Sequence, residues 1–319
     1  SKRQFRLLLV TALGILLTVS GLALAQELQR APLNPEFLEY RERLNSAEKG
    51  ETPFYGYIPP TVDLSHLQGP IFEGLHTAAY PSTYDLRNVS GVSYVTSVRN
   101  QNPFGTCWAF GTMGSLESTT LRNKQGVSAA AEPDYSEWHL AYFAYTDQNS
   151  TLLSFTRDTV APGSNVIFDQ GGNTIKSTAI LARWTGAVNE TDCPYWNTDS
   201  NPPASELPTG NEPNARIVTS ALFLGSSYNE SDIKYALTNY GAVTIIYYHD
   251  NPYWNAANNS YYMNVVAGAG DGWHLVTIVG WNDDYAAADF NTAPSGNGAW
   301  IVKNSWGTSW GDNGYFYLS

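Results

Sequence analysis

Cys107 stands in a sequence context that suits nucleophilic catalysis. Residues 101–110 read QNPFGTCWAF, so the amide side chain of Gln101 precedes the thiol and a tryptophan follows it at once. A thiol near its reference pKa of about 8.5 is mostly protonated at neutral pH, but a helix N-terminus and a nearby imidazolium stabilise the thiolate. A helical pattern begins at Thr106 and Cys107. This pattern favours Cys107 as a nucleophile, and a buried structural cysteine is the alternative.

Residues far downstream supply the other groups of an acyl-transfer site. His274 opens the apolar run HLVTIVGW, which predicts a buried strand holding the imidazole of a general base. Asn304 would bond the second imidazole nitrogen and fix its tautomer, and Trp306 would cover that bond and line the substrate site. The Gln101 amide and the backbone N–H of Cys107 would form an oxyanion hole.

Each of these assignments has an alternative. His249 follows an aromatic strand end and is a weaker candidate for the base, while His139 on an amphipathic helix is expected to be structural. Asn304 could be a loop residue packed by a neighbouring tryptophan, and Gln101 a polar loop residue.

Apolar periodicity predicts the elements that position these side chains. Helices are predicted from Cys107 to Gly126, over 136–145 with Ser136 as N-cap, over 175–184, and over 231–239 with Asn229 or Ser231 as N-cap. Strands are predicted over 92–98, 218–224, 242–248, 274–281, 299–303 and 315–318. The order predicts an α+β fold, with a cleft between a helical lobe at about 81–205 and a β-rich lobe at about 206–319.

The N-terminal part of the sequence differs from the rest in composition. Residues 1–25 combine a basic start, an apolar run and the small-x-small site Ala23-Leu24-Ala25, which predicts a secretory signal. An uncleaved membrane anchor is the alternative, because a spanning helix needs about 20 apolar residues. Residues 26–80 are rich in proline and polar groups, with one helical stretch at 35–44, and are interpreted as a pro-segment or linker. We therefore expect export to the cell envelope or the medium.

The amino-acid composition of the chain limits the classes of molecule that it is expected to bind. The chain has 319 residues, of which 43% are hydrophobic and 14% charged, and this composition argues against a disordered or coiled-coil chain. A net charge of −12 disfavours nucleic acid and anionic membranes as partners. Cys107 and Cys193 are the only cysteines. One disulfide between them is the alternative to two free thiols, and the chemistry expected at Cys107 favours free thiols.

No metal or cofactor is expected. The sequence contains no phosphate-binding loop and no His-Glu-x-x-His or Cys-x-x-Cys motif. Asp283, Asp284 and Asp289 lie in a loop that is interpreted as solvated rather than calcium-binding.

Together, Gln101, the Cys107-Trp-Ala-Phe run, His274 and the run NSWGTSWGDNGY at 304–315 resemble the papain family of cysteine peptidases, in that family's order. The resemblance covers roughly 81–319. It implies a helical lobe and a barrel-like lobe, with the cysteine and the histidine facing each other across a cleft. By the same resemblance, Gly171 and Gly172 match a glycine pair that binds extended substrate backbone, since no side chain blocks its approach; a helix-entry turn is the alternative.

The sequence departs from the family pattern in several places. Phe104 stands where the family usually has a cysteine, and Trp273 stands where an acidic residue often precedes the histidine. Residues 26–80 lack a long helical inhibitory pattern and look more like a bacterial branch that carries a lectin-like domain. Ser319 falls inside a predicted strand, so further family strands are expected beyond it.

These features predict an exported, monomeric cysteine peptidase, and specifically an endopeptidase, acting on protein or peptide substrates. It would contact a membrane only through an uncleaved signal segment. The alternatives are a catalytically weak binding or adhesion protein on the same scaffold, and another acyl transferase with the same Cys-His-Asn groups. The presence of all four groups argues against the first, and the Asn304-Ser-Trp-Gly run argues against the second.

Overall fold

The computed structural model describes residues 31–45, 55–65, 79–124, 132–145, 165–182, 185–198, 208, 229–265 and 272–319. The signal predicted for 1–25 and the strand predicted for 218–224 lie outside these residues. Leu33–Ser319 forms one compact unit, to which the whole description below applies. Among the described residues, none of the helices is both long and apolar enough to cross a membrane.

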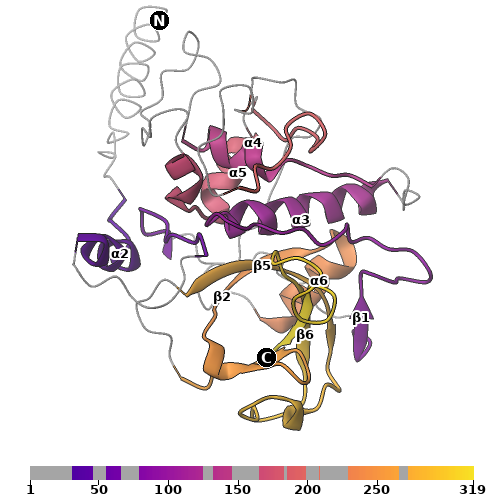
Figure 1. The fold of residues 1–319 in the computed structure, drawn as a ribbon. Coiled ribbons are helices and arrows are strands. Elements are labelled where there is room, and N and C mark those ends of the chain that lie inside the picture. The colour runs from indigo at the N-terminus through magenta and orange to yellow at the C-terminus, as the bar shows by residue number, and fades with distance from the viewer. Residues whose placement is uncertain are drawn as a thin grey trace, which may run out of the picture. The chain divides into compact units, whose positions relative to one another are not determined.

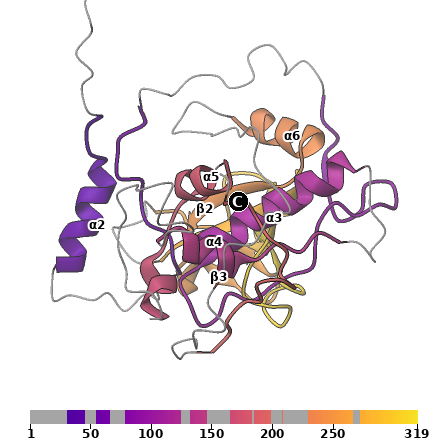
Figure 2. The same cartoon turned by 90° about the horizontal axis from the view of Figure 1, so that it is seen from above.

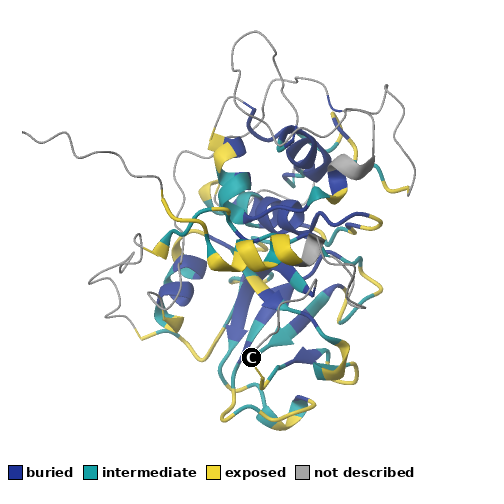
Figure 3. Ribbon diagram, turned by 90° about the vertical axis from the view of Figure 1, so that its left-hand side faces the viewer, coloured by how far each residue is buried: buried dark blue, intermediate teal, exposed yellow. Residues whose placement is uncertain are grey.

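Helix α3 (Cys107–Asn123) is the central element of the unit (Figure 1). One side packs against the sheet, mainly strand β5 (Trp273–Asn282), and the other against α4 (Glu137–Phe143) and α5 (Thr174–Ala182). A 3-10 helix at Asn165–Gln170 packs onto α4. Burying a helix on both sides requires apolar or small residues around it, and eleven residues of α3 are buried. Figure 3 shows the buried residues gathered in the helices and in the strands beneath them.

The predicted helix caps are confirmed. The Ser136 hydroxyl accepts a hydrogen bond of 3.0 Å from the His139 amide at the start of α4. Asn229 caps α6 (Glu230–Asn239) in a reciprocal capping box with Asp232. Each cap satisfies amide groups that have no partner within the helix. Helix α6 packs against β5 and β2 (Figure 2).

Seven strands form one mixed sheet in the order β1-β5-β6-β7-β4-β3, with β2 also paired to β5. The remaining strands are β1 (Thr83–Asp85), β2 (Val243–Tyr248), β3 (Trp254–Asn255), β4 (Ser260–Tyr261), β6 (Ala299–Lys303) and β7 (Tyr315–Leu318). Only the β4–β7 pair is parallel among these pairings. The α+β class is confirmed, and within the described residues the expected barrel-like lobe is an open sheet.

One predicted strand is wrong. Residues 92–98 form no strand, because the Val92 and Tyr94 amides donate to the Val89 and Leu86 carbonyls in a local turn and other groups bond to side chains. The Thr96 hydroxyl donates to Glu117, and the Ser97 amide donates to Glu132. Strand β1 lies within the range expected for the helical lobe. It nevertheless belongs to the sheet, because it pairs with the C-terminal end of β5.

Helix α2 (Pro35–Asn45) corresponds to the helical stretch predicted within the N-terminal segment. Leu33 bridges Val62, and the Asn34 amide donates to the Thr61 carbonyl at 3.1 Å, so the two sides of this segment are tied together. Between them, residues 55–58 cross the face of the site described next. We call residues 55–58 the covering segment.

Candidate active site

Cys107 is the first residue of α3 and is completely buried. Its sulfur accepts a hydrogen bond of 3.3 Å from the amide of Leu275, which follows His274 on β5. The first turn of a helix has amides without intrahelical partners, which favour negative charge beside them. The thiol therefore lies where the N-terminus of α3 meets the strand that carries His274.

His274 and Asn304 are hydrogen-bonded. His274 Nε2 lies 2.8 Å from Asn304 Oδ1, and the same oxygen accepts the Ser305 amide at 2.7 Å. Because this oxygen is already an acceptor, Nε2 must carry the proton of a neutral ring. The other nitrogen, Nδ1, is buried and has no partner among the described residues, so it remains available as a base.

Trp306 lies flat against His274, with ring centroids 4.6 Å apart and planes inclined by 14°. Both His274 and Asn304 are buried. A ring stacked on the imidazole keeps water from the bond between them, which strengthens the bond and limits rotation of the imidazole.

Hydrogen bonds hold both the backbone and the side chain of Gln101. Its amide donates to the Ser305 carbonyl at 2.8 Å, and its side-chain oxygen accepts the Ser305 hydroxyl at 2.7 Å. That second bond fixes the direction of the side-chain amide, so Nε2 donates to the Tyr55 carbonyl oxygen at 2.9 Å and to the Phe104 carbonyl oxygen at 3.1 Å. The backbone amide of Cys107 donates to the same oxygen at 3.2 Å. Two donors thus converge on one carbonyl.

The covering segment continues along the glycine pair. The Gly172 amide donates to the Gly56 carbonyl at 2.8 Å, and the Ile58 amide donates to the Gly172 carbonyl at 3.0 Å. These bonds form a parallel bridge between Tyr57 and Gly172. A Cβ on Gly172 would overlap the Trp108 ring, so the close approach requires glycine. Gly171 is held from behind by the Tyr145 hydroxyl, which donates to its carbonyl at 2.7 Å.

Burial shifts the pKa values of Cys107 and His274 in opposite directions. Desolvation raises the pKa of the Cys107 thiol to about 12, although hydrogen bonds from Leu275 and Trp108 oppose the rise. Desolvation lowers the pKa of His274 to about 3, against the bond to Asn304. In this arrangement the thiol and the imidazole are both neutral at pH 7.

The rival histidine lies in the wall of the same site. The ring of His249 meets Trp306 edge-on at 5.0 Å, and its Nδ1 lies 3.0 Å from the Tyr247 hydroxyl. Burial lowers the pKa of His249 to about 4. It does not share the Asn304 bond, so the geometry favours His274 as the base. His139 lies on α4, completely buried.

Other residues support the site without a sequence signal that singles them out. Phe104 packs among Trp138, Phe168 and Tyr195, so aromatic contacts occupy the place of the usual cysteine. Cys107 and Cys193 are both free. The bonds made by Tyr55 and Tyr195 involve groups that are distant in the sequence, which is why no motif marks these two residues. Ser305 lies within the run at 304–315, but that run does not indicate its bond to Gln101.

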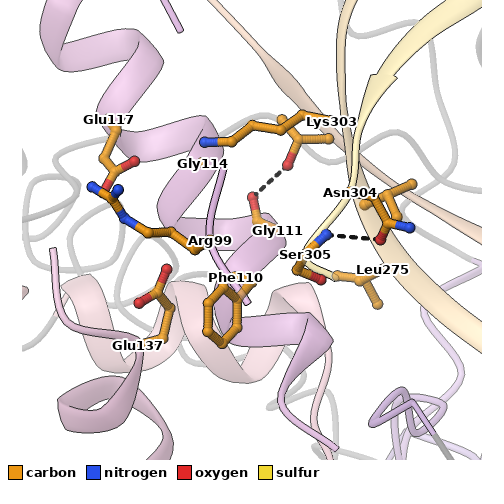
Figure 4. A pocket seen from close by; sticks show the side chains of 12 residues that line it. Arg99, Phe110, Gly111, Gly114, Glu117, Glu137, Leu275, Lys303, Asn304 and Ser305 are labelled. Atoms are coloured by element: carbon orange, nitrogen blue, oxygen red, sulfur yellow. Dashed lines mark hydrogen bonds between the residues drawn. The ribbon is translucent and has the colours of Figure 1, made fainter. Parts of the chain in front are cut away.

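A small polar cavity lies behind Asn304, between α3 and the sheet (Figure 4). Its volume is about 20 Å³, which is room for one water molecule. Glu117 and Lys303 line it, and the Lys303 ammonium donates to the Thr96 hydroxyl at 3.0 Å. Among the described residues, no three His, Cys, Asp or Glu side chains gather to hold a metal ion.

Comparison with known proteins agrees with this geometry. The family model described as papain family cysteine protease matches residues 80–319. Fruit bromelain of Ananas comosus is 25% identical over 256 residues, which cover 78% of this chain and 57% of bromelain. This chain therefore spans less than two thirds of that relative. The match confirms the resemblance predicted from the four motifs.

Solved structures show the same fold. The cysteine protease and lectin-like domains of Cwp84, a surface layer associated protein of Clostridium difficile, are 26% identical with a TM-score of 0.63 over 91% of this chain and 57% of that chain. The Cwp84 protease after propeptide cleavage matches 75% of this chain and 54% of that chain, at 27% identity and a TM-score of 0.54. The procathepsin L2 proteinase of Tenebrio molitor larval midgut is 24% identical, with a TM-score of 0.55 over 88% of this chain and 81% of that chain.

Proposed function

Because this chain belongs to the papain family of cysteine proteases, we propose that it is the precursor of an exported cysteine peptidase that hydrolyses peptide bonds in proteins or peptides. One observation carries the proposal. The Tyr55 carbonyl oxygen accepts hydrogen bonds from Gln101 Nε2 at 2.9 Å and from the Cys107 amide at 3.2 Å. A peptide carbonyl of the chain itself thus occupies the place where a substrate oxyanion would be stabilised.

The chemistry then follows from the groups around Cys107. With substrate in place, His274 Nδ1 takes the proton of the Cys107 thiol. The resulting thiolate attacks the carbonyl carbon, and the oxygen takes up negative charge between Gln101 and the Cys107 amide. When the C–N bond breaks, His274 Nδ1 gives its proton to the leaving amine and a thioester remains. His274 then takes a proton from water, which attacks the thioester and releases the acid and the thiolate. Asn304 keeps Nε2 engaged throughout.

The covering segment is tied down beyond the Tyr55 carbonyl. The Gly56 carbonyl accepts a hydrogen bond from the Gly172 amide at 2.8 Å, and the Ile58 amide donates to the Gly172 carbonyl at 3.0 Å. His274 contacts the ring of Tyr55, with ring centroids 5.1 Å apart. We infer that residues 55–58 block the site without being cut.

The electrostatics support the same interpretation. A catalytic thiol of this kind needs the thiolate and imidazolium pair. Under the covering segment, burial raises the Cys107 pKa and lowers the His274 pKa, so the neutral pair is favoured. Displacing residues 55–58 returns water to the site and removes that penalty.

The proposed organisation is a signal at 1–25, a pro-segment at 26–80 and a peptidase domain at 81–319. The position of residues 55–58 over Cys107 supports an inhibitory pro-segment. The share of this chain that matches Cwp84 is 91% in one structure and 75% after propeptide cleavage, which is consistent with that division. The surface association of Cwp84 and the features of 1–25 support export.

Gly56 offers a direct test in the full chain. Its φ is +116° and a Cβ would overlap the Gly105 carbonyl, so Gly56→Val should displace the covering segment. We expect the full chain carrying Gly56→Val to cleave a quenched peptide library. Adding Cys107→Ala should abolish cleavage, while adding Cys193→Ala, the matched control, should leave it unchanged. Cleavage that persists with Cys107→Ala would refute the proposed nucleophile.

A further inference from the structure

The loop that carries both oxyanion donors has no covalent brace. Gln101 lies at one end and Cys107 at the other, and both cysteines of the chain are free. A turn closes the loop, with the Phe104 amide donating to the Gln101 carbonyl at 3.1 Å. The separation of the two donors therefore depends on what holds the two ends.

A single hydroxyl bonds to both ends. The Tyr195 hydroxyl donates to the Gln101 carbonyl at 2.5 Å and lies 2.7 Å from the Thr106 hydroxyl. A carbonyl only accepts, so the one phenolic proton is used on Gln101 and the Thr106 hydroxyl must donate to the Tyr195 oxygen. Burial raises the pKa of Tyr195, so the phenol stays protonated and keeps both bonds.

Tyr195 is itself fixed in the helical half. Its ring meets Phe110 and Trp138 edge-on, at centroid distances of 5.1 and 5.6 Å. Its amide donates to Glu190 Oε1 at 2.7 Å. A side chain held at its ring and at its backbone transmits that rigidity to the groups bonded to its hydroxyl.

We propose that Tyr195 is a positioning residue of the oxyanion hole. Its hydroxyl sets the spacing between the Gln101 carboxamide and the Cys107 amide by bonding the Gln101 backbone and Thr106, which precedes the nucleophile. It acts through these residues and does not touch the carbonyl in the hole. This inference rests on the proposed function. A residue that only fills the core would need the ring and not the hydroxyl.

Kinetics in the full chain carrying Gly56→Val separate these roles. Tyr195→Phe should lower kcat about tenfold with KM within about twofold, because misplaced donors lose transition-state stabilisation. In a Gln101→Ala background the same change should cost less than about threefold, because one of the two oxyanion donors whose spacing Tyr195 sets is gone. Alkylation of Cys107 by iodoacetamide builds no oxyanion and should be unchanged. Tyr285→Phe, which removes a hydroxyl bond to the Asn258 carbonyl at 3.0 Å, is the matched control.

Amide hydrogen exchange tests the bonds of the Tyr195 hydroxyl without requiring catalysis. In the full chain with Gly56 intact, Tyr195→Phe should speed amide exchange at 101–107 and Tyr285→Phe should not. Unchanged exchange rates at 101–107 in Tyr195→Phe would overturn the proposal. So would a double variant whose loss of kcat equals the product of the losses in Tyr195→Phe and Gln101→Ala. If the Gly56→Val chain cleaves no peptide, the proposed function fails, and the exchange result alone decides the role of Tyr195.

Discussion

The backbone nitrogen of Cys107 donates a hydrogen bond of 3.2 Å to the carbonyl oxygen of Tyr55. The amide of the proposed nucleophile is thus engaged by a peptide carbonyl from the N-terminal segment of the same chain. Gln101 completes the contact from the other side at 2.9 Å. One carbonyl therefore connects the proposed pro-segment to both donors of the proposed oxyanion hole.

Removing the Gln101 side chain should weaken catalysis more than substrate binding. Loss of one oxyanion donor typically lowers kcat by about 10²–10³-fold. We expect that range for Gln101→Ala in the Gly56→Val chain, measured by steady-state hydrolysis of a quenched peptide. The iodoacetamide alkylation rate of Cys107 is the control and should stay constant. A fall in kcat of less than about threefold would contradict the role of Gln101 as an oxyanion donor.

Removing the Asn304 side chain should disturb the imidazole. Without Oδ1 at 2.8 Å, nothing fixes the proton on Nε2, and the fraction of His274 with Nδ1 free to act as base falls. We expect Asn304→Ala to lower kcat on the order of 10²-fold, the lower end of what general acid–base catalysis supplies. Asn239→Ala, at an exposed asparagine near the end of α6, is the control. Equal activity of the two variants would contradict the role of Asn304.

His139 should make the fold sensitive to acid. Both ring nitrogens are buried without a partner among the described residues, and burial lowers the pKa of His139 from 6.5 to about 4. The folded protein therefore binds a proton at His139 less readily than the unfolded chain does. As far as His139 determines it, the free energy of unfolding has its full value above pH 6.5 and decreases as the pH falls toward 4. The loss amounts to about 3 kcal/mol over that window.

Replacing His139 tests this contribution. His139→Leu should remove that part of the pH dependence, because leucine has no buried nitrogen to protonate. The free energy of urea unfolding at pH 7 and at pH 4 measures it, in chains that carry Cys107→Ala to prevent self-digestion. The same decrease between the two pH values with and without His139 would contradict the prediction.

Much of the site could be predicted from sequence because its chemistry is carried by particular side chains. Cys107 and Asn304 stand in distinctive runs, while the run that begins at His274 is specific only in combination with them. The structure brings these residues together with Gln101. The elements around them followed from apolar periodicity, as with α3 and β5. Strand β1 did not, since three residues are too few to show alternation.

The covering segment could not be predicted for a different reason. Residues 55–58 contact Gln101, Cys107 and Gly172 through backbone groups, which every residue has. Pro59 and Pro60, which follow them, suggested only a break in regular structure. Tyr195 is similar, because its hydroxyl bonds a backbone carbonyl far earlier in the chain. Contacts of this kind depend on tertiary structure, and local sequence patterns do not record them.

The central claim is that residues 55–58 cover a working thiol at Cys107. Its most direct test is the rate at which iodoacetamide alkylates Cys107 at pH 7, followed by mass spectrometry in full chains of verified intact mass. We predict slow alkylation of Cys107 with Gly56 intact, and alkylation at least about tenfold faster in Gly56→Val, because uncovering the site lowers the thiol pKa. Gly296→Val, where a Cβ meets nothing within 4 Å, should behave like the parent chain, and Cys193 should stay slow in all three. Equal rates for Cys107 in the parent and in Gly56→Val would contradict the account.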